Sequence, residues 1–252
     1  MFLYNDKIRL TEIFPIPHLP AFKAYIDYDF GEIWCTNSLK STSYMLLSGS
    51  FVYLFGEPNI QLIKNLSTKS KVSKLTLIPL NSEWGEYLIN QKSVNLIHKY
   101  RYRTKLCKFN EKIIRETIDN LKLEIKFMEI NDSIFNEISH LSWCKTSCIL
   151  FDDYNKFKKL GSGFVAFRND EIISCAMSYF VYSQGIEITV TTQENYRNLG
   201  LATICAGKLI KKSMAKGVYC NWDATSLNSL NVAIKLGYIL QELYDAFYYY
   251  LE

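Results

Sequence analysis

The feature that most constrains the fold of this chain is a regular succession of strands and helices after residue 160. Alternating apolar residues and turn residues predict three consecutive strands, then a helix, a strand, a second helix and a last strand. The expected ranges are 164–168, 172–182 and 186–192 for the first strands, 201–215 for the helix, 218–224 for the next strand, 226–236 for the second helix and 238 onward for the last strand. This order predicts an α+β or mixed α/β fold, in which helices pack on a mixed sheet.

The residues before 160 have a different composition. All five prolines lie within the first 79 residues, whereas seven of the eleven glycines lie from residue 161 onward. Local patterns predict a hairpin at 41–56, a helix that begins at 60–64, strands at 74–79, 98–109 and 123–130, and helices at 110–121 and from 132. We therefore expect two domains, a divergent α/β domain at 1–155 and a second domain at 156–252.

The polar segment at 191–202 carries the most specific chemical signal in the chain. It reads Thr-Thr-Gln-Glu-Asn-Tyr-Arg-Asn-Leu-Gly-Leu-Ala and joins an expected strand to an expected helix. Such a junction leaves backbone N–H groups unpaired at the positive end of the helix dipole, which favours a pyrophosphate. Gly200 permits a close approach of backbone to phosphate, and Ala202 keeps that approach open. The alternative is that Gly200 only makes a tight turn into a core helix.

The pattern Arg197-x-x-Gly200-x-Ala202, placed after three strands, resembles the acetyl-coenzyme A signature of the GNAT superfamily of N-acetyltransferases. Three downstream segments are similar to one branch, the two-part bacterial acetyltransferases related to the zwittermicin A resistance acetyltransferase. These segments are Asn221-Trp222-Asp223-Ala224, Ser229 and Lys235-Leu236-Gly237-Tyr238. The resemblance covers residues 160–252 and implies a GNAT-type twisted mixed sheet with flanking helices, preceded by a divergent N-terminal lobe.

The resemblance also implies a function. We expect an enzyme that transfers an acetyl group from acetyl-CoA to a primary amine, with a small molecule as the acceptor and residues 1–155 on the acceptor side. Acetyl-CoA would lie between the fourth and fifth strands of the GNAT fold, with its pyrophosphate on the glycine loop. The residues expected to bind it are Val190, Thr191, Thr192, Arg197, Asn198, Leu199, Gly200, Leu201, Ala202, Ser226 and Ser229.

Transfer to a neutral amine requires a base that removes the amine proton and donors for the developing oxyanion. Several family members carry a catalytic glutamate on the fourth strand, and the resemblance places Glu187 there; the alternative is a solvent-facing structural glutamate. Asp223 is the second candidate, either for orienting the amine or for holding the loop at Trp222. The tyrosine that protonates the thiolate in many family members corresponds to Ala233 here, so the general acid stays open. Four tyrosines near the C-terminus are available, Tyr244, Tyr248, Tyr249 and Tyr250.

Charge and patterning limit the alternatives. The net charge of +4 and a pI near 8.5 are below the values typical of a dedicated DNA-binding domain. Basic residues at 99, 101, 103 and 105 alternate with aromatic and apolar ones, which predicts a strand with a solvated basic face and, as the alternative, a surface for RNA. Nucleic acid is not an expected partner. Two other functions stay open: a non-catalytic module that binds CoA or a partner protein, and an RNA-associated acyltransferase.

Cysteine usage and hydropathy indicate the compartment. Cys144 and Cys148 find no second pair that would complete a zinc quartet, so no metal is expected, and with Trp143 they are interpreted as the end of an apolar helix face. No run of about 18 apolar residues and no signal peptide pattern occurs in the sequence. We therefore expect a cytoplasmic protein with reduced cysteines and no membrane partner. The sequence leaves the oligomeric state open.

Overall fold

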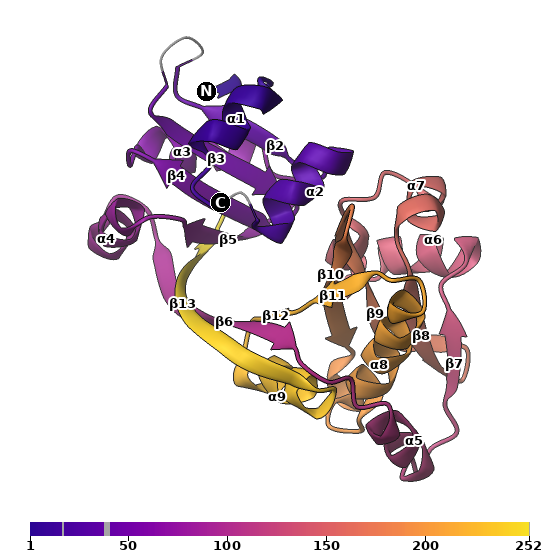
Figure 1. The fold of residues 1–252 in the computed structure, drawn as a ribbon. Coiled ribbons are helices and arrows are strands. Elements are labelled where there is room, and N and C mark those ends of the chain that lie inside the picture. Colours follow the sequence, from indigo (N-terminus) through magenta and orange to yellow (C-terminus); the bar gives the residue numbers. More distant parts are fainter. Residues whose placement is uncertain (17, 38–40, 252) are drawn as a thin grey trace. The chain divides into compact units, whose positions relative to one another are not determined.

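The computed structural model describes residues 1–16, 18–37 and 41–251 and has a mixed α/β fold (Figure 1). It separates into two compact units, one formed by residues 1–101 with 244–252 and the other by residues 102–243. These units are not bounded at 155/156, the division expected from composition, which stays a prediction. Strand β7 (Lys126–Glu129) is antiparallel to β8 (Gly163–Arg168), which brings residues before 156 into the sheet of the second unit.

The first unit contains a sheet in the order β1-β2-β3-β4-β5-β13, to which β13 (Tyr238–Tyr250) contributes its C-terminal part. The other strands are β1 (Phe2–Leu3), β2 (Glu32–Cys35), β3 (Ser43–Ser48), β4 (Phe51–Gly56) and β5 (Lys74–Pro79). The antiparallel pairing of β3 with β4 confirms the predicted hairpin, and β4 is parallel to β5. The helices are α1 (Lys7–Ile13), α2 (Pro20–Tyr28), α3 (Ile60–Lys64), the short η1 (Leu66–Thr68) and α4 (Ser82–Asn90).

The strand β6 (Leu96–Leu106) departs from the predicted basic outer face. Arg101 has only 4% of its surface exposed, whereas Tyr100 is 52% exposed. The guanidinium carbon of Arg101 lies 4.9 Å from the ring centre of Phe51. The prediction of a solvated basic face is therefore wrong at Arg101, because a guanidinium can stack on an aromatic ring while its methylene stem is buried.

The second unit is built on a five-stranded sheet in the order β11-β10-β9-β8-β7. Its remaining strands are β9 (Glu171–Tyr182), β10 (Gly185–Thr192) and β11 (Tyr219–Asn221). Strands β7 to β10 pair antiparallel, and β10 pairs parallel with β11 through the crossover helix α8 (Leu201–Met214), which packs against β8, β9 and β10 (Figure 1). The predicted mixed sheet with flanking helices is confirmed.

Six further helical segments belong to this unit. They are α5 (Lys112–Asp119), α6 (Asp132–His140), η2 (Lys145–Cys148), α7 (Tyr154–Leu160), η3 (Glu194–Tyr196) and α9 (Leu227–Lys235). Of these, α5 packs on α8, where Ile114 lies against the backbone of Gly207. The N-terminal half of the chain therefore contributes a helix that packs on the crossover helix α8.

The single strand predicted at 218–224 is two strands. β11 ends at Asn221, and β12 (Asp223–Ala224) follows after the buried residue Trp222. β11 pairs parallel with β10, whereas β12 pairs antiparallel with the end of β6. Because the two segments pair with different strands, the chain must bend at Trp222, and the prediction of one continuous strand is wrong.

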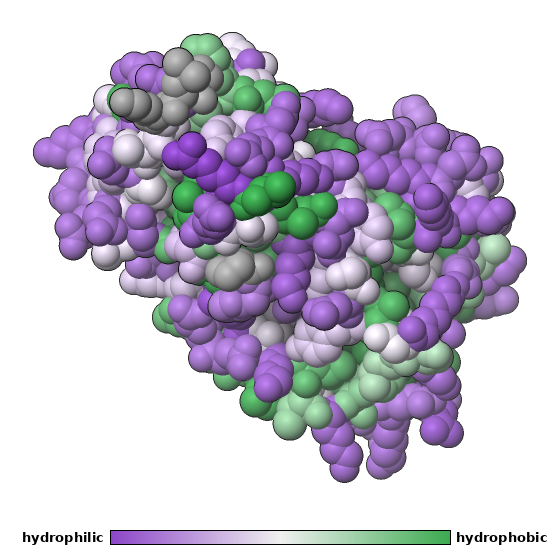
Figure 2. All heavy atoms as spheres, turned by 45° about the horizontal axis from the view of Figure 1, so that its top comes forward, coloured by the Kyte–Doolittle hydropathy of each residue, from purple (hydrophilic) through white to green (hydrophobic). Residues whose placement is uncertain are grey.

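Side-chain burial follows the usual separation of apolar and polar groups. On the face drawn in Figure 2, hydrophilic side chains cover most of the surface and hydrophobic ones form small patches. Across residues 1–16, 18–37 and 41–251, no helix is long and apolar enough to cross a bilayer. The same residues contain no group of three or more His, Cys, Asp or Glu side chains placed to hold a metal ion. The cytoplasmic location stays a prediction.

The seven cysteines divide sharply by exposure. Six are buried free thiols, and Cys107 alone of the seven is exposed. Burial raises the pKa of Cys148 to about 11 and, even more, the pKa of Cys205 to about 12. Since the thiolate is the reactive form, Cys148 and Cys205 are protected both by poor access and by protonation, whereas Cys144, whose pKa is lowered by a hydrogen bond to Cys175, is protected by burial.

We therefore predict that iodoacetamide at pH 8 modifies the folded protein once, at Cys107. Mass spectrometry after brief labelling should show one adduct on the native protein and seven on the protein in denaturant. A Cys107→Ser variant serves as the control and should stay unlabelled while folded. Rapid addition of two or more groups to the native protein would contradict the burial of the other six thiols.

Candidate active site

The loop between β10 and α8 leaves the start of α8 without a side-chain cap. Two of its residues, Asn198 and Gly200, have left-handed backbone angles, with φ of 64° and 82°. Gly200 occupies the N-cap position and has no side chain to offer, so the first-turn N–H groups of residues 201–203 have no hydrogen-bond partner among the described residues. Unpaired N–H groups at the positive end of a 14-residue helix form a site for an anion.

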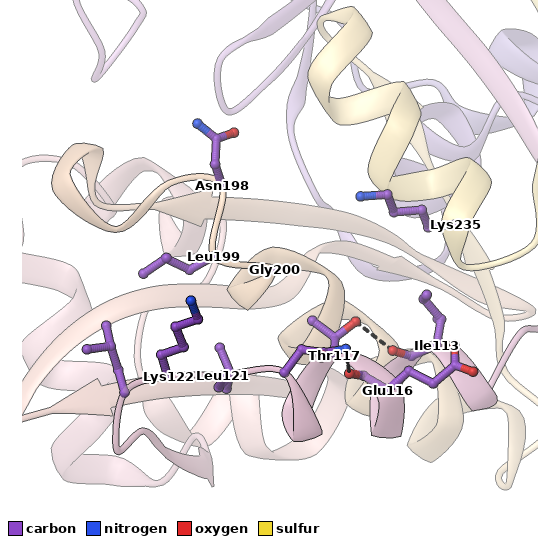
Figure 3. A pocket seen from close by; sticks show the side chains of 11 residues that line it. Ile113, Glu116, Thr117, Leu121, Lys122, Asn198, Leu199, Gly200 and Lys235 are labelled. Carbon is purple, nitrogen blue, oxygen red and sulfur yellow. Dashed lines mark hydrogen bonds between the residues drawn. The ribbon is translucent and has the colours of Figure 1, made fainter.

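Gly200 is required by its surroundings as well as by its backbone angle. A Cβ atom added there would collide with Cγ2 of Thr117 on α5. Figure 3 shows the side chain of Thr117 beside the loop, with its hydroxyl donating a hydrogen bond to the carbonyl of Ile113. The tight turn considered as an alternative for Gly200 is therefore present, and it coexists with an open helix N-terminus.

A pocket of about 310 Å³ opens on this helix N-terminus. From the loop and the first turn of α8 it is lined by the predicted residues Thr192, Arg197, Asn198, Gly200, Leu201 and Ala202. Its other wall is α9, which contributes Asn228, Asn231, Val232 and Lys235. These four positions lie on one face of the helix, because they are spaced three or four residues apart. That spacing is visible in the sequence, but these residues were not among the predicted site residues.

A second pocket, of about 700 Å³, lies at the same loop (Figure 3). It shares Asn198, Gly200 and Lys235 with the smaller pocket, and α5 with the segment after it supplies most of the remaining wall. The ammonium groups of Lys122 and Lys235 face this region, and neither has an ion-pair partner in the described part of the chain. Glu116 also lines the pocket, and its charge is balanced by Lys112 at 2.9 Å.

The other residues predicted to bind the cofactor lie at the end of β10 and the start of α9. The hydroxyl of Thr191 lies 3.5 Å from that of Ser147, and the hydroxyl of Thr192 lies 2.8 Å from that of Ser174. Val190 is half-buried beside them, and the remaining predicted residue of the loop, Leu199, lines the larger pocket.

The two serines of α9 have structural partners. The hydroxyl of Ser226 accepts a hydrogen bond from the N–H of Ser229 at 3.3 Å and caps α9. The hydroxyl of Ser229 accepts one from the indole N–H of Trp222 at 3.1 Å. Neither serine lines either of the two pockets described above.

Glu187 is buried, with 8% of its surface exposed, so the alternative of a solvent-facing glutamate is wrong. Its neighbours Ile186 and Ile188 are buried too, so β10 is covered on both faces at this point. One carboxylate oxygen accepts a hydrogen bond from the backbone N–H of Asp223 at 3.0 Å, and the other accepts one from the side-chain amide of Asn221. Asp223 itself is half-buried.

The groups around Glu187 stay protonated near neutral pH. Burial first, and then the carboxylate of Glu187, raises the pKa of Cys220 to about 11. Burial also raises the pKa values of Tyr182, Tyr219 and Tyr238, with a smaller contribution from Glu187. These side chains can donate hydrogen bonds but cannot act as bases at neutral pH.

The general acid stays open. Ala233 is fully buried on α9, so the family's tyrosine has no counterpart there. The four candidate tyrosines near the C-terminus belong to the first unit, and the ring of Tyr248 lies under the ammonium of Lys74, 3.8 Å from its centre. The structure assigns no general acid among them.

Comparison with known proteins identifies the family to which this chain is similar. The family model described as GNAT acetyltransferase matches residues 12–247. A curated relative, "Uncharacterized N-acetyltransferase YdfB" of Bacillus subtilis (strain 168), is 29% identical over 100 residues, which span 39% of this chain and only 38% of the relative.

Two crystal structures resemble the chain over almost its full length. A GCN5-related N-acetyltransferase-like protein from Streptococcus suis 89/1591 is 29% identical, with a TM-score of 0.84 and coverage of 97% of this chain and 98% of that one. A putative acetyltransferase from Novosphingobium aromaticivorans, with 10% identity, a TM-score of 0.54 and coverage of 94% and 99%, shares the fold alone. The acetyltransferase expected from the loop at 197–202 is confirmed at the level of the family. Because the family model matches residues 12–247, the chain belongs to the GNAT acetyltransferase family.

Proposed function

We propose that this protein transfers the acetyl group of acetyl-CoA to a primary amine of a small-molecule acceptor. The observation that carries the proposal is the uncapped N-terminus of α8 behind Gly200, which opens on the 310 Å³ pocket. Unpaired backbone N–H groups and the helix dipole suit the two negative charges of a pyrophosphate. Membership of a family that uses acetyl-CoA supports the same ligand.

The predicted residues would divide between two parts of the ligand. Arg197 to Ala202 would hold the pyrophosphate, and the backbone of Val190, Thr191 and Thr192 would bind the pantetheine arm. The pantetheine would lie where β10 and β11 separate, since their parallel pairing ends at Glu187 and Asn221. The face of α9 that lines the 310 Å³ pocket would flank the pyrophosphate.

The larger pocket suits the 3′-phosphoadenosine end of the same ligand. Ile113, Leu121 and Leu199 give it apolar walls for a flat base. The unpaired ammonium groups of Lys122 and Lys235 would bind the 3′-phosphate. Because this pocket meets the smaller one at Gly200, one continuous ligand would occupy both.

The reaction needs few groups from the protein. The neutral amine attacks the thioester carbonyl, the nitrogen loses a proton, and CoA leaves as its thiol after the sulfur gains one. Glu187 and Asp223 stay the predicted carboxylates for this chemistry. Backbone N–H groups at the end of β10 would stabilise the oxyanion.

Several finer expectations stay predictions. They are the similarity to the zwittermicin A resistance branch, the acceptor side in residues 1–155, the cytoplasmic location and the lack of a metal requirement. A non-catalytic CoA-binding module is the competing function, and thiol release from acetyl-CoA over a panel of amines separates the two. The burial of Arg101 on β6 leaves less basic surface for the RNA-associated alternative.

The loop glycine provides a test of the pyrophosphate site. Gly200→Glu should lower the affinity for acetyl-CoA by about 100-fold or more, because the new carboxylate would repel the phosphates and its Cβ would meet Thr117. Isothermal titration calorimetry measures the affinity. Gly217→Ala is the matched control, since Gly217 also has positive φ, 70°, but no atom within 4 Å of an added Cβ.

The Gly217→Ala control should lose about 1–2 kcal/mol of stability from backbone strain and keep its affinity for acetyl-CoA. Unchanged affinity in Gly200→Glu would remove the pyrophosphate from this loop. Thermal unfolding of both variants separates loss of the fold from loss of the site.

A second prediction concerns the 3′-phosphate. Wild-type protein should bind CoA about tenfold more tightly than dephospho-CoA, because a charge-assisted contact is worth about 1.5 kcal/mol or more. Lys122→Ala and Lys235→Ala should each reduce this preference, whereas Lys216→Ala, an exposed lysine outside both pockets, should not. Equal affinity of the wild type for the two nucleotides would place the 3′-phosphate elsewhere.

A further inference from the structure

The bend of the chain at Trp222, between β11 and β12, is held by side chains from three other elements. Thr104 of β6 donates a hydrogen bond to the carbonyl of Trp222 at 2.6 Å. Ser229 of α9 accepts one from the indole N–H of Trp222 at 3.1 Å. Glu187 of β10 accepts hydrogen bonds from the residues on both sides of Trp222, the amide side chain of Asn221 and the backbone N–H of Asp223.

The bend marks the point where two strands of the sheet separate. The parallel pairing of β10 with β11 covers only Gly185 to Glu187 on one side and Tyr219 to Asn221 on the other. Beyond it β10 continues to Thr192, while the chain after Trp222 pairs with β6 instead. The gap between the two strands therefore begins at Glu187.

The carboxylate of Glu187 replaces part of the missing strand pairing. Asp223 lies two residues past Asn221, the last residue paired with β10, and its N–H donates to the side chain of Glu187. A buried carboxylate is costly unless its oxygens accept hydrogen bonds, and here both oxygens do. This environment suits an ionised group that fixes the position of its donors.

We propose that Glu187 is a positioning residue that fixes the bend at Asn221–Asp223 and thereby the width of the gap between β10 and β11. The inference rests on the proposed function, because the gap is where the pantetheine arm would lie. A general base must lie within reach of the proton that it removes. Glu187 is buried, and each of its oxygens accepts a hydrogen bond from the segment 221–223, so its carboxylate faces the bend. Of the two predicted carboxylates, this role leaves Asp223 as the candidate to act on the amine.

Exchange of the two hydrogen-bonding partners tests the proposal. Glu187→Gln removes the negative charge and presents an NH₂ group, which finds an acceptor only if the side-chain amide of Asn221 rotates to offer its oxygen. Asn221→Asp places a second carboxylate against Glu187. The double variant Glu187→Gln/Asn221→Asp restores both contacts, because the glutamine oxygen accepts from the N–H of Asp223 and its NH₂ donates to the new aspartate.

The measured quantities are the affinity for acetyl-CoA and, with an amine that supports thiol release by the wild type, kcat and the KM for acetyl-CoA. All measurements are made at a temperature where circular dichroism shows that every variant is folded. We expect each single variant to weaken acetyl-CoA binding about tenfold or more and the double variant to recover to within about threefold of the wild type. Glu171→Gln is the control for loss of one negative charge, since Glu171 is exposed on β9 of the same sheet, and it should behave as the wild type.

Thr104→Val provides a test that leaves both carboxylates in place. Valine has nearly the shape of threonine but cannot donate to the carbonyl of Trp222, so the bend loses one support and nothing else. We expect weaker acetyl-CoA binding, with a rise in KM that exceeds the fall in kcat.

Three results would contradict the positioning role of Glu187. Loss of kcat by about 10²–10⁴-fold in Glu187→Gln with unchanged acetyl-CoA affinity, and no recovery in the double variant, would make Glu187 the base and overturn the inference alone. Unchanged acetyl-CoA affinity in Thr104→Val and in both single variants would also overturn it. Absence of acetyl-CoA binding by the wild type would overturn the proposed function and, with it, the inference.

Discussion

The parallel pairing of β10 with β11 is the constraint on which the second unit depends. It requires the crossover helix α8, and it places the N-terminus of that helix at the end of β10. Because the pairing stops at Glu187 and Asn221, the strands diverge on the side where α8 begins. The short pairing thus places the divergence of the strands and the uncapped N-terminus of α8 on the same side of the sheet, and the proposed ligand would need both.

Segments distant in sequence complete the surroundings of the helix N-terminus. α5 approaches the loop closely enough that only glycine fits at 200, and α9 supplies the opposite wall of the smaller pocket. A helix N-terminus attracts anions through its own dipole, but the shape of the space around it is set by the elements packed on either side. Here those elements come from residues 112–123 and 228–235.

The two compact units share strands, which composition could not reveal. β6 and β13 each have one part in each unit, so the boundaries at 101/102 and 243/244 fall inside regular strands rather than in a linker. The shift in proline and glycine near residue 160 marks a change in local structure, since these residues respond to turns and helix ends. It carries no information about which strands pair across long distances.

The sequence by itself determined the order of elements after residue 160 and the loop at 197–202, because alternation, helix-ending glycines and an uncapped helix start are local properties. Only the tertiary structure decided the burial of Glu187 and Arg101 and the break at Trp222. Each depends on a partner far along the chain: Asn221 and Asp223 for Glu187, Phe51 for Arg101, and β6 for the segment after Trp222. A periodic pattern predicts which residues alternate, but it does not show which distant segments cover a face or where a strand changes its pairing partner.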